Sequence, residues 1–290
     1  MHRFRVLSLI CLLAACSALA APRKALVIDG QNNHDWRATT PVLKKILEEN
    51  GLFQVDVATA PPHGADMSSF RPKFADYDVV VSNYNGDPWG PEANADFERY
   101  VRAGGGVVIY HAADNAFPDW KDYSEMIAVG GWAARSTGKN GVMVRWRDGN
   151  AVTDSTPKSC GNHGARLPFL VTIRDREHPI TKGLPAAWIH AADELYDSLC
   201  GPAQNLTVLG TAHSEPQNHG TGEEEPMLMT IRYGKGRIFH TTLGHDVAAM
   251  QCAGFITTLT RGAEWAATGA VTQPVPKDFP TAEAASIRKE

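Results

Sequence analysis

The fold of this chain is decided by the stretch Gly104-Gly105-Gly106-Val107-Val108-Ile109-Tyr110-His111. The three glycines end a preceding helix. The apolar run after them does not alternate with polar residues, so it predicts a strand that is buried on both faces. Such strands are typical of parallel sheets that helices cover on both sides, and they indicate an α/β protein. His111 stands where the strand ends.

The residues on the amino-terminal side repeat this pattern. Apolar runs predict strands at residues 24–29 and 78–83, and alternation of apolar and polar residues predicts another at residues 53–59. Helices are predicted from Pro41 to Gly51 and from Pro91 to the glycine triplet, because proline favours the first helical position and apolar residues follow at helical spacing. The first half therefore predicts strand, helix, strand, strand, helix, strand, as in a parallel layered sheet.

The carboxyl-terminal half is more mixed. A hairpin turn at residues 233–236 implies antiparallel pairing, and further strands are predicted at residues 142–146, 169–173, 207–211, 227–233 and 237–242. A final helix is predicted over about residues 248–268. We expect one domain over residues 21–269, with a mostly parallel sheet and antiparallel additions in this half, and a loosely held tail over residues 270–290.

The first twenty residues differ from the rest. A basic head at His2, Arg3 and Arg5 precedes an apolar run, and Ala18-Leu19-Ala20 offers small residues before a cleavage point. This pattern predicts a secretory signal peptide over residues 1–20, because the apolar run is too short to span a bilayer. Cleavage here places the protein in the periplasm or outside the cell. In the alternative, Leu13-Ala-Ala-Cys16 is a bacterial lipobox and Cys16 carries a lipid anchor.

Composition excludes several classes of partner. The net charge is −4 and no block of Lys and Arg occurs, which argues against nucleic acid and anionic membranes. No segment after the leader is long and apolar enough to be transmembrane, and a homo-oligomer stays open. Cys160, Cys200 and Cys252 lie beyond the leader. Export permits a disulfide, either Cys160 with Cys200 or none, with three buried thiols.

Polar residues gather where the predicted strands end. Ligands of open α/β sheets bind beyond the carboxyl ends of the strands, so these residues are candidates for one site. His163, between two glycines, joins them because its loop allows close approach to a ligand. We expect substrate contacts from His34, Asp35, Trp36, Asn83, Asn85, Asp114 and His163, and sugar stacking on Trp36, Trp89 or Trp120.

Three histidine and acidic segments carry the predicted chemistry. His111 is expected as a neutral imidazole that acts as base or metal ligand, or else as a half-buried capping residue. Glu194 is expected as its acid or base partner, or else as one of a solvated surface pair with Asp193. His245 and Asp246 are expected in the site, with the alternative that Asp246 caps the last helix. Catalysis is thus assigned to His111, Glu194 and Asp246, and one divalent metal ion to His111, Glu194 and His245.

The chain resembles the ThuA-like proteins of the trehalose-utilisation type, which are similar in fold to flavodoxin and to class I glutamine amidotransferases. The resemblance covers about residues 24–269. The matching segments are His34-Asp-Trp36, Gly104-Gly-Gly-Val-Val-Ile-Tyr-His111, His178-Pro-Ile-Thr-Lys-Gly-Leu184, Asp193-Glu-Leu-Tyr196, Gly236-Arg-Ile-Phe-His-Thr-Thr-Leu-Gly-His-Asp246 and Gly262-Ala-Glu-Trp-Ala266.

The resemblance implies a role in carbohydrate catabolism. Amidotransferases of this fold keep a nucleophilic Cys at the turn after the central strand, and here that turn reads Tyr110-His111-Ala112. Amide transfer is therefore excluded. Some ThuA-like proteins are associated with 3-keto-glycosides, so we expect an exported hydrolase or lyase that processes such a small carbohydrate by acid–base or metal-assisted chemistry. The alternative is a non-catalytic periplasmic sugar-binding or accessory module.

Overall fold

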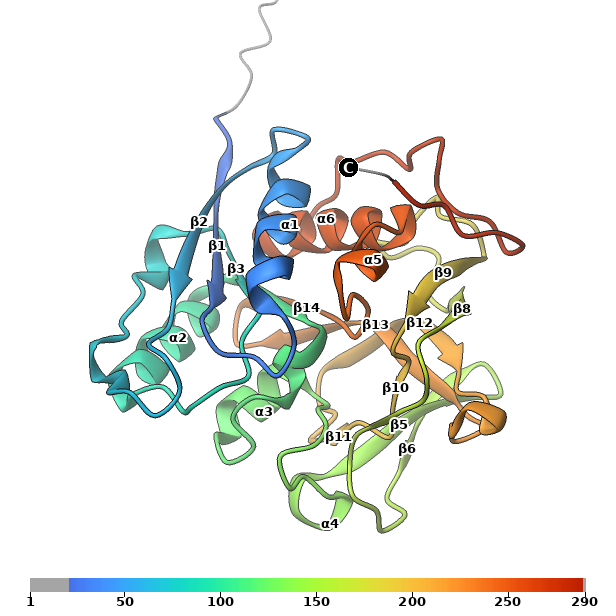
Figure 1. Cartoon of the computed structure of the whole chain (residues 1–290), viewed down its shortest axis with the longest axis horizontal. Helices are drawn as coiled ribbons and strands as arrows, with labels where there is room; N and C mark the ends of the chain where they lie inside the picture. Colours follow the sequence, from blue (N-terminus) through green and yellow to red (C-terminus); the bar gives the residue numbers. More distant parts are fainter. Residues whose placement is uncertain (1–20, 289–290) are drawn as a thin grey trace, which may run out of the picture.

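The computed structural model describes residues 21–288 (Figure 1). The predicted signal peptide and Cys16 lie outside the described residues. A nine-stranded sheet runs through the middle of the molecule. In spatial order its strands are β2 (Phe53–Thr59), β1 (Arg23–Asp29), β3 (Val79–Ser82), β4 (Gly106–Tyr110), β14 (Gly236–Thr241), β13 (Glu224–Tyr233), β12 (Leu206–His213), β8 (Leu167–Ile173) and β9 (Ala187–Asp193).

The sheet is mixed, as predicted. Strands β2, β1, β3, β4 and β14 are all parallel, and their order is the flavodoxin-like one. From β14 to β9 every pairing is antiparallel, and the Tyr233–Gly236 hairpin joins β13 to β14. Smaller sheets are formed by β5 (Val142–Arg147), β6 (Asn150–Asp154) and β11 (Cys200–Gly201), and by β7 (Asn162–His163) with β10 (Tyr196–Asp197).

Helices cover both faces of the parallel half, which explains why its inner strands β1, β3 and β4 are mostly apolar, while the edge strand β2 alternates. Helices α1 (Trp36–Glu48), α5 (Val247–Met250) and α6 (Ala253–Thr268) lie on one face, and α2 (Pro91–Ala103) and α3 (Lys121–Ile127) lie on the other (Figure 1). Each face buries its own apolar core. The remaining helical segments are α4 (Thr137–Asn140) and the single turns Met67–Ser69, Phe74–Asp76, His111–Asn115 and Pro216–Asn218.

The structure differs from the prediction in the start of one helix, in the division of another and in the packing of the tail. Helix α1 begins at Trp36 and contains Pro41, because the Asp35 carboxylate accepts the Ala38 N–H and starts the helix earlier. The single helix predicted over residues 248–268 is divided into α5 and α6 at Cys252. The segment after residue 269 has little regular structure, but it packs closely on the domain through Phe279 and through a backbone hydrogen bond from Ala253 to Ser286.

A disulfide joins Cys160 to Cys200, the first of the two arrangements that the sequence left open. Cys252 is a buried thiol. Within residues 21–288, no helix combines the length and the apolar character that crossing a membrane requires.

Candidate functional site

Four side chains meet at the carboxyl edge of the sheet. His34 follows β1, His111 follows β4, Glu194 follows β9 and His245 follows β14. Each offers one nitrogen or oxygen, and these four atoms lie within 4.8 Å of one another. The three residues to which the sequence assigned a metal ion are therefore together, and His34, which it assigned to substrate, is the fourth.

His111 presents a free nitrogen to this cluster. Its Nδ1 lies 2.6 Å from the carbonyl oxygen of Thr242, which can only accept, so Nδ1 carries the proton and Nε2 the lone pair. The buried Nε2 has no hydrogen-bond partner among residues 21–288 and stands 4.0 Å from Glu194 Oε2. Burial lowers the pKa of His111 to about 4, so the imidazole is neutral at physiological pH.

His34 is oriented in the same manner. Its Nδ1 lies 3.1 Å from Asn32 Oδ1, while the Asn32 amide nitrogen donates to Asn83 Oδ1. Asn83 in turn donates to the hydroxyls of two α1 threonines. The chain of amides leaves the Nε2 of His34 facing Glu194 Oε2 at 3.8 Å. Asn83, predicted as a substrate contact, is therefore a buried support for His34.

Glu194 is the acidic centre of the cluster. Its Oε2 lies 3.0 Å from His245 Nδ1, and its Oε1 lies 3.7 Å from His163 Nδ1. Burial by itself raises the pKa of Glu194. The neighbouring His245 and His34 lower it by more than burial raises it, so the pKa of Glu194 is well below its ordinary value. The carboxylate is thus ionised at neutral pH. It is a member of the site, and the alternative of a solvated surface pair is wrong.

Asp193 holds two of these residues in place. The fully buried carboxylate accepts hydrogen bonds from the backbone N–H groups of Glu194 (2.8 Å), Gly244 (2.7 Å) and His245 (3.0 Å), and from the imidazole of His190 (2.8 Å). Sequence reasoning assigned no role to Asp193 or His190. The sequence signals this support only weakly. His190 and Asp193 stand three positions apart at the end of a strand, and Asp193 is followed by a second acidic residue.

Several predicted site residues lie elsewhere. Asp246 caps α5, as the alternative prediction had it, and it also forms an ion pair with Arg166. Asp114 is fully buried against His240. Asp35 caps α1. Asn85 bonds to Asn33 beside a separate cavity of about 670 Å³ at the ends of β1, β2 and β3.

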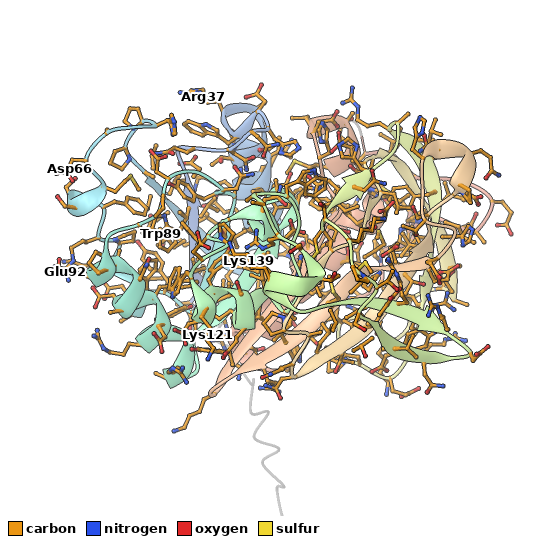
Figure 2. The ribbon with its side chains drawn as sticks, turned by 90° about the horizontal axis from the view of Figure 1, so that it is seen from below. Arg37, Asp66, Trp89, Glu92, Lys121 and Lys139 are labelled. Atoms are coloured by element: carbon orange, nitrogen blue, oxygen red, sulfur yellow. A yellow bond between two sulfur atoms is a disulfide. The ribbon has the colours of Figure 1, made fainter. Side chains whose placement is uncertain are left out.

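The three tryptophans expected to stack on sugar are poorly placed for it. Trp89 is buried in an aromatic cluster, and Figure 2 labels it farther inside the molecule than Glu92 of α2. Trp120 packs against the same cluster. Trp36 lines the separate cavity, and the guanidinium of Arg37 covers its ring at 4.2 Å.

These features define a class of protein. The sheet has the flavodoxin-like order of the glutamine amidotransferase-like fold, while the turn after β4 carries His111 where an amidotransferase keeps its Cys. The chain belongs to the ThuA family, whose sequence profile, described as trehalose utilisation, matches residues 24–266. No match is found among proteins with curated descriptions.

Solved structures agree with this assignment. A putative ThuA-like protein from Parabacteroides merdae ATCC 43184 is 51% identical, with a TM-score of 0.90 over 92% of this chain and 98% of its own. A putative ThuA-like protein from Bacteroides uniformis ATCC 8492 is 22% identical, with a TM-score of 0.59 over 89% and 96% of the two chains. The cytoplasmic protein STM3548 from Salmonella typhimurium shares the fold at 14% identity and a TM-score of 0.50, over 82% and 96%.

Proposed function

We propose that this protein is an exported, metal-dependent enzyme of carbohydrate catabolism that cleaves or isomerises 3-keto-glycosides. The observation that carries the proposal is the cluster of His34, His111, Glu194 and His245, with a buried and unpartnered Nε2 on His111. Neutral imidazoles and one carboxylate are the donors that zinc and similar divalent ions prefer. The carbonyl and amide oxygens behind His111 and His34 are the outer contacts that orient such ligands.

The substrate class follows from combining this site with the family. A ketone at C3 of a sugar acidifies the hydrogen at C2, so a base can remove that proton. The group at C1 then departs with the electrons of its bond to C1 and takes up a proton, and water adds to C1 as the C2 proton returns. A metal ion bound at the cluster supplies Lewis acidity that polarises the ketone oxygen.

His163 is the side chain best placed to act as the base. Its Nδ1 lies 2.9 Å from the carbonyl oxygen of Gly164, which fixes the proton on Nδ1 and leaves the lone pair on Nε2. The side chain is 38% exposed, so substrate can reach it. The Glu194 carboxylate beside Nδ1 stabilises the imidazolium that forms when Nε2 takes the C2 proton. His163, expected to bind substrate, therefore takes the role first given to His111 and Glu194.

Metal analysis and turnover of a 3-keto-disaccharide test the proposal together. We expect one zinc ion per chain in the wild type and in His213→Ala, an exposed histidine outside the cluster. His111→Ala loses the ion, whereas His163→Ala keeps it and loses about 10²–10⁴-fold in rate. Near-normal turnover by metal-free His111→Ala overturns the proposal. Sugar binding with neither metal nor product identifies a non-catalytic module instead.

The proposed export has its own support and test. The Cys160–Cys200 disulfide fits an oxidising compartment such as the periplasm. Amino-terminal sequencing of the protein recovered from cells is expected to begin at Ala21. A lipid-modified Cys16 as the first residue supports the lipoprotein alternative, and an intact Met1 contradicts export.

A further inference from the structure

The turn Trp132-Ala133-Ala134 beside the cluster has an unusual backbone. Its three residues have φ values of +51°, +46° and +60°, in the left-handed region that favours glycine. Each such residue costs about 1–3 kcal/mol and persists only where its surroundings impose it. Three in succession therefore indicate a conformation that neighbouring residues must hold in place.

The surroundings do impose this turn. The N–H of Trp132 donates to the carbonyl of Cys160 at 2.8 Å, and Gly130 exchanges two backbone hydrogen bonds with Cys200. The two cysteines of the disulfide therefore hold the backbone at Gly130 and at Trp132 in fixed positions. On the other side, the buried guanidinium of Arg135 donates to three backbone carbonyls at 2.6–3.2 Å.

The indole ring of Trp132 is held next to the cluster. It lies so close to Gly161 that a Cβ at that position would stand 2.7 Å from two ring atoms. Its centroid is 4.6 Å from Tyr196 and 5.9 Å from His163, and Tyr196 packs on His111 at 4.3 Å. The indole is partly exposed, so it forms an apolar surface beside the side chain that we propose as the base.

We propose that Trp132 is the platform on which a pyranose ring of the substrate stacks during turnover. The inference rests on the proposed function, since it assigns the sugar to this wall of the same site. The C–H-rich face of a pyranose is apolar while its edge is polar, which matches a fixed indole flanked by an imidazole. Because the strained turn fixes the ring before the sugar arrives, little side-chain entropy is lost on binding.

Calorimetry with the zinc-loaded protein tests this assignment. The probes are trehalose, which lacks the C3 ketone of the proposed reaction, and 3-keto-trehalose, which is titrated in the His163→Ala background so that turnover does not consume it. Trp132→Ala is expected to raise the Kd of the sugar at least about tenfold, while Trp132→Phe stays within about threefold of the wild type. Gly161→Ala, whose Cβ would stand 2.6 Å from the backbone nitrogen of Trp132 and 2.7 Å from its indole, is expected to shift the whole residue and to weaken sugar binding as well. The Kd of zinc is expected to stay unchanged in all of these variants, and Trp36→Ala serves as the matched control for both ligands.

Two results overturn the assignment of Trp132 alone. One is a sugar Kd in Trp132→Ala equal to that of the wild type. The other is parallel loss of zinc and sugar, which gives Trp132 a merely structural role. If the zinc-loaded protein with Trp132 intact binds neither sugar, the proposed function fails, and the platform fails with it.

Discussion

Asp193→Asn is the substitution that most directly tests how the cluster is held. An amide keeps one acceptor oxygen, which can still receive the N–H groups of Glu194 and His245. Its NH2 group then faces the Gly244 N–H, which loses its acceptor, and His190, which loses its counter-charge. Breaking a buried pair of this kind costs about 3–5 kcal/mol. Loss of an outer support weakens metal binding about 10–100-fold.

The pH dependence of stability gives this prediction a second readout. Burial alone lowers the pKa of His190, but Asp193 and Cys252 outweigh it and raise the pKa from 6.5 to about 9. A raised pKa stabilises the fold fully below pH 6.5, and the contribution is lost as pH rises through about 9. A shift of this size corresponds to about 3 kcal/mol. We expect the unfolding free energy of the wild type to fall over this range, and that of Asp193→Asn to change much less.

Urea unfolding at pH 6, 7.5 and 9 and zinc titration of the folded protein measure both effects. Asp197→Asn is the control, since Asp197 is equally buried and bonds to Ser198, Ser214 and Asn162 rather than to the cluster. It is expected to lose stability without losing zinc affinity. If Asp193→Asn matches the wild type in stability and zinc affinity, the reasoning is refuted.

Three further predictions concern the scaffold. Replacing Cys160 and Cys200 with serine opens a loop of 40 residues and is expected to cost about 4 kcal/mol, seen as a lower urea midpoint; an unchanged midpoint contradicts it. Gly262→Ala places a Cβ 2.1 Å from a phenylalanine ring of β14 and is expected to cost about 1–3 kcal/mol by calorimetry, more than Gly138→Ala, where space is open. Arg145→Met leaves the buried Glu225 without its ion-pair partner and is expected to lower the unfolding free energy by about 3–5 kcal/mol at pH 8. The double variant Arg145→Met/Glu225→Leu is expected to recover part of this loss. Equal stability of Arg145→Met and the wild type contradicts the role of the pair.

The sequence predicts the parallel half of the sheet well, because most of its strands are continuous apolar runs and because Pro91 and the glycine triplet mark the two ends of α2. It also predicts that His111 and His245 share an edge, since both follow parallel strands. It groups Glu194 with them by residue type alone, because it does not predict β9, the strand that delivers Glu194 from four strands away from β14 in the sheet order. That proximity depends on long-range packing, which local patterns do not encode.

Other features depend on side-chain direction. Asp114 and Asp246 follow strands as predicted, yet Asp114 turns into the core, where it meets His240 of β14, and Asp246 caps α5 by accepting the N–H of Ala249. Trp132 escapes sequence reasoning altogether, since nothing in its residue type signals a positive φ. The sequence thus locates the edge of the site, while local competition for hydrogen bonds decides which residues face it.

The position of β14 has a consequence for how the chain folds. The last strand in sequence is inserted between β4 and β13, near the middle of the sheet. Until it arrives, the hydrogen-bonding edge of β4 stays open, and such edges recruit other chains. Amino-terminal fragments are therefore prone to aggregate, and closing so long a loop is slow. Since His245 and the Thr242 carbonyl that orients His111 both follow this strand, the cluster of four side chains is complete only once folding is essentially complete.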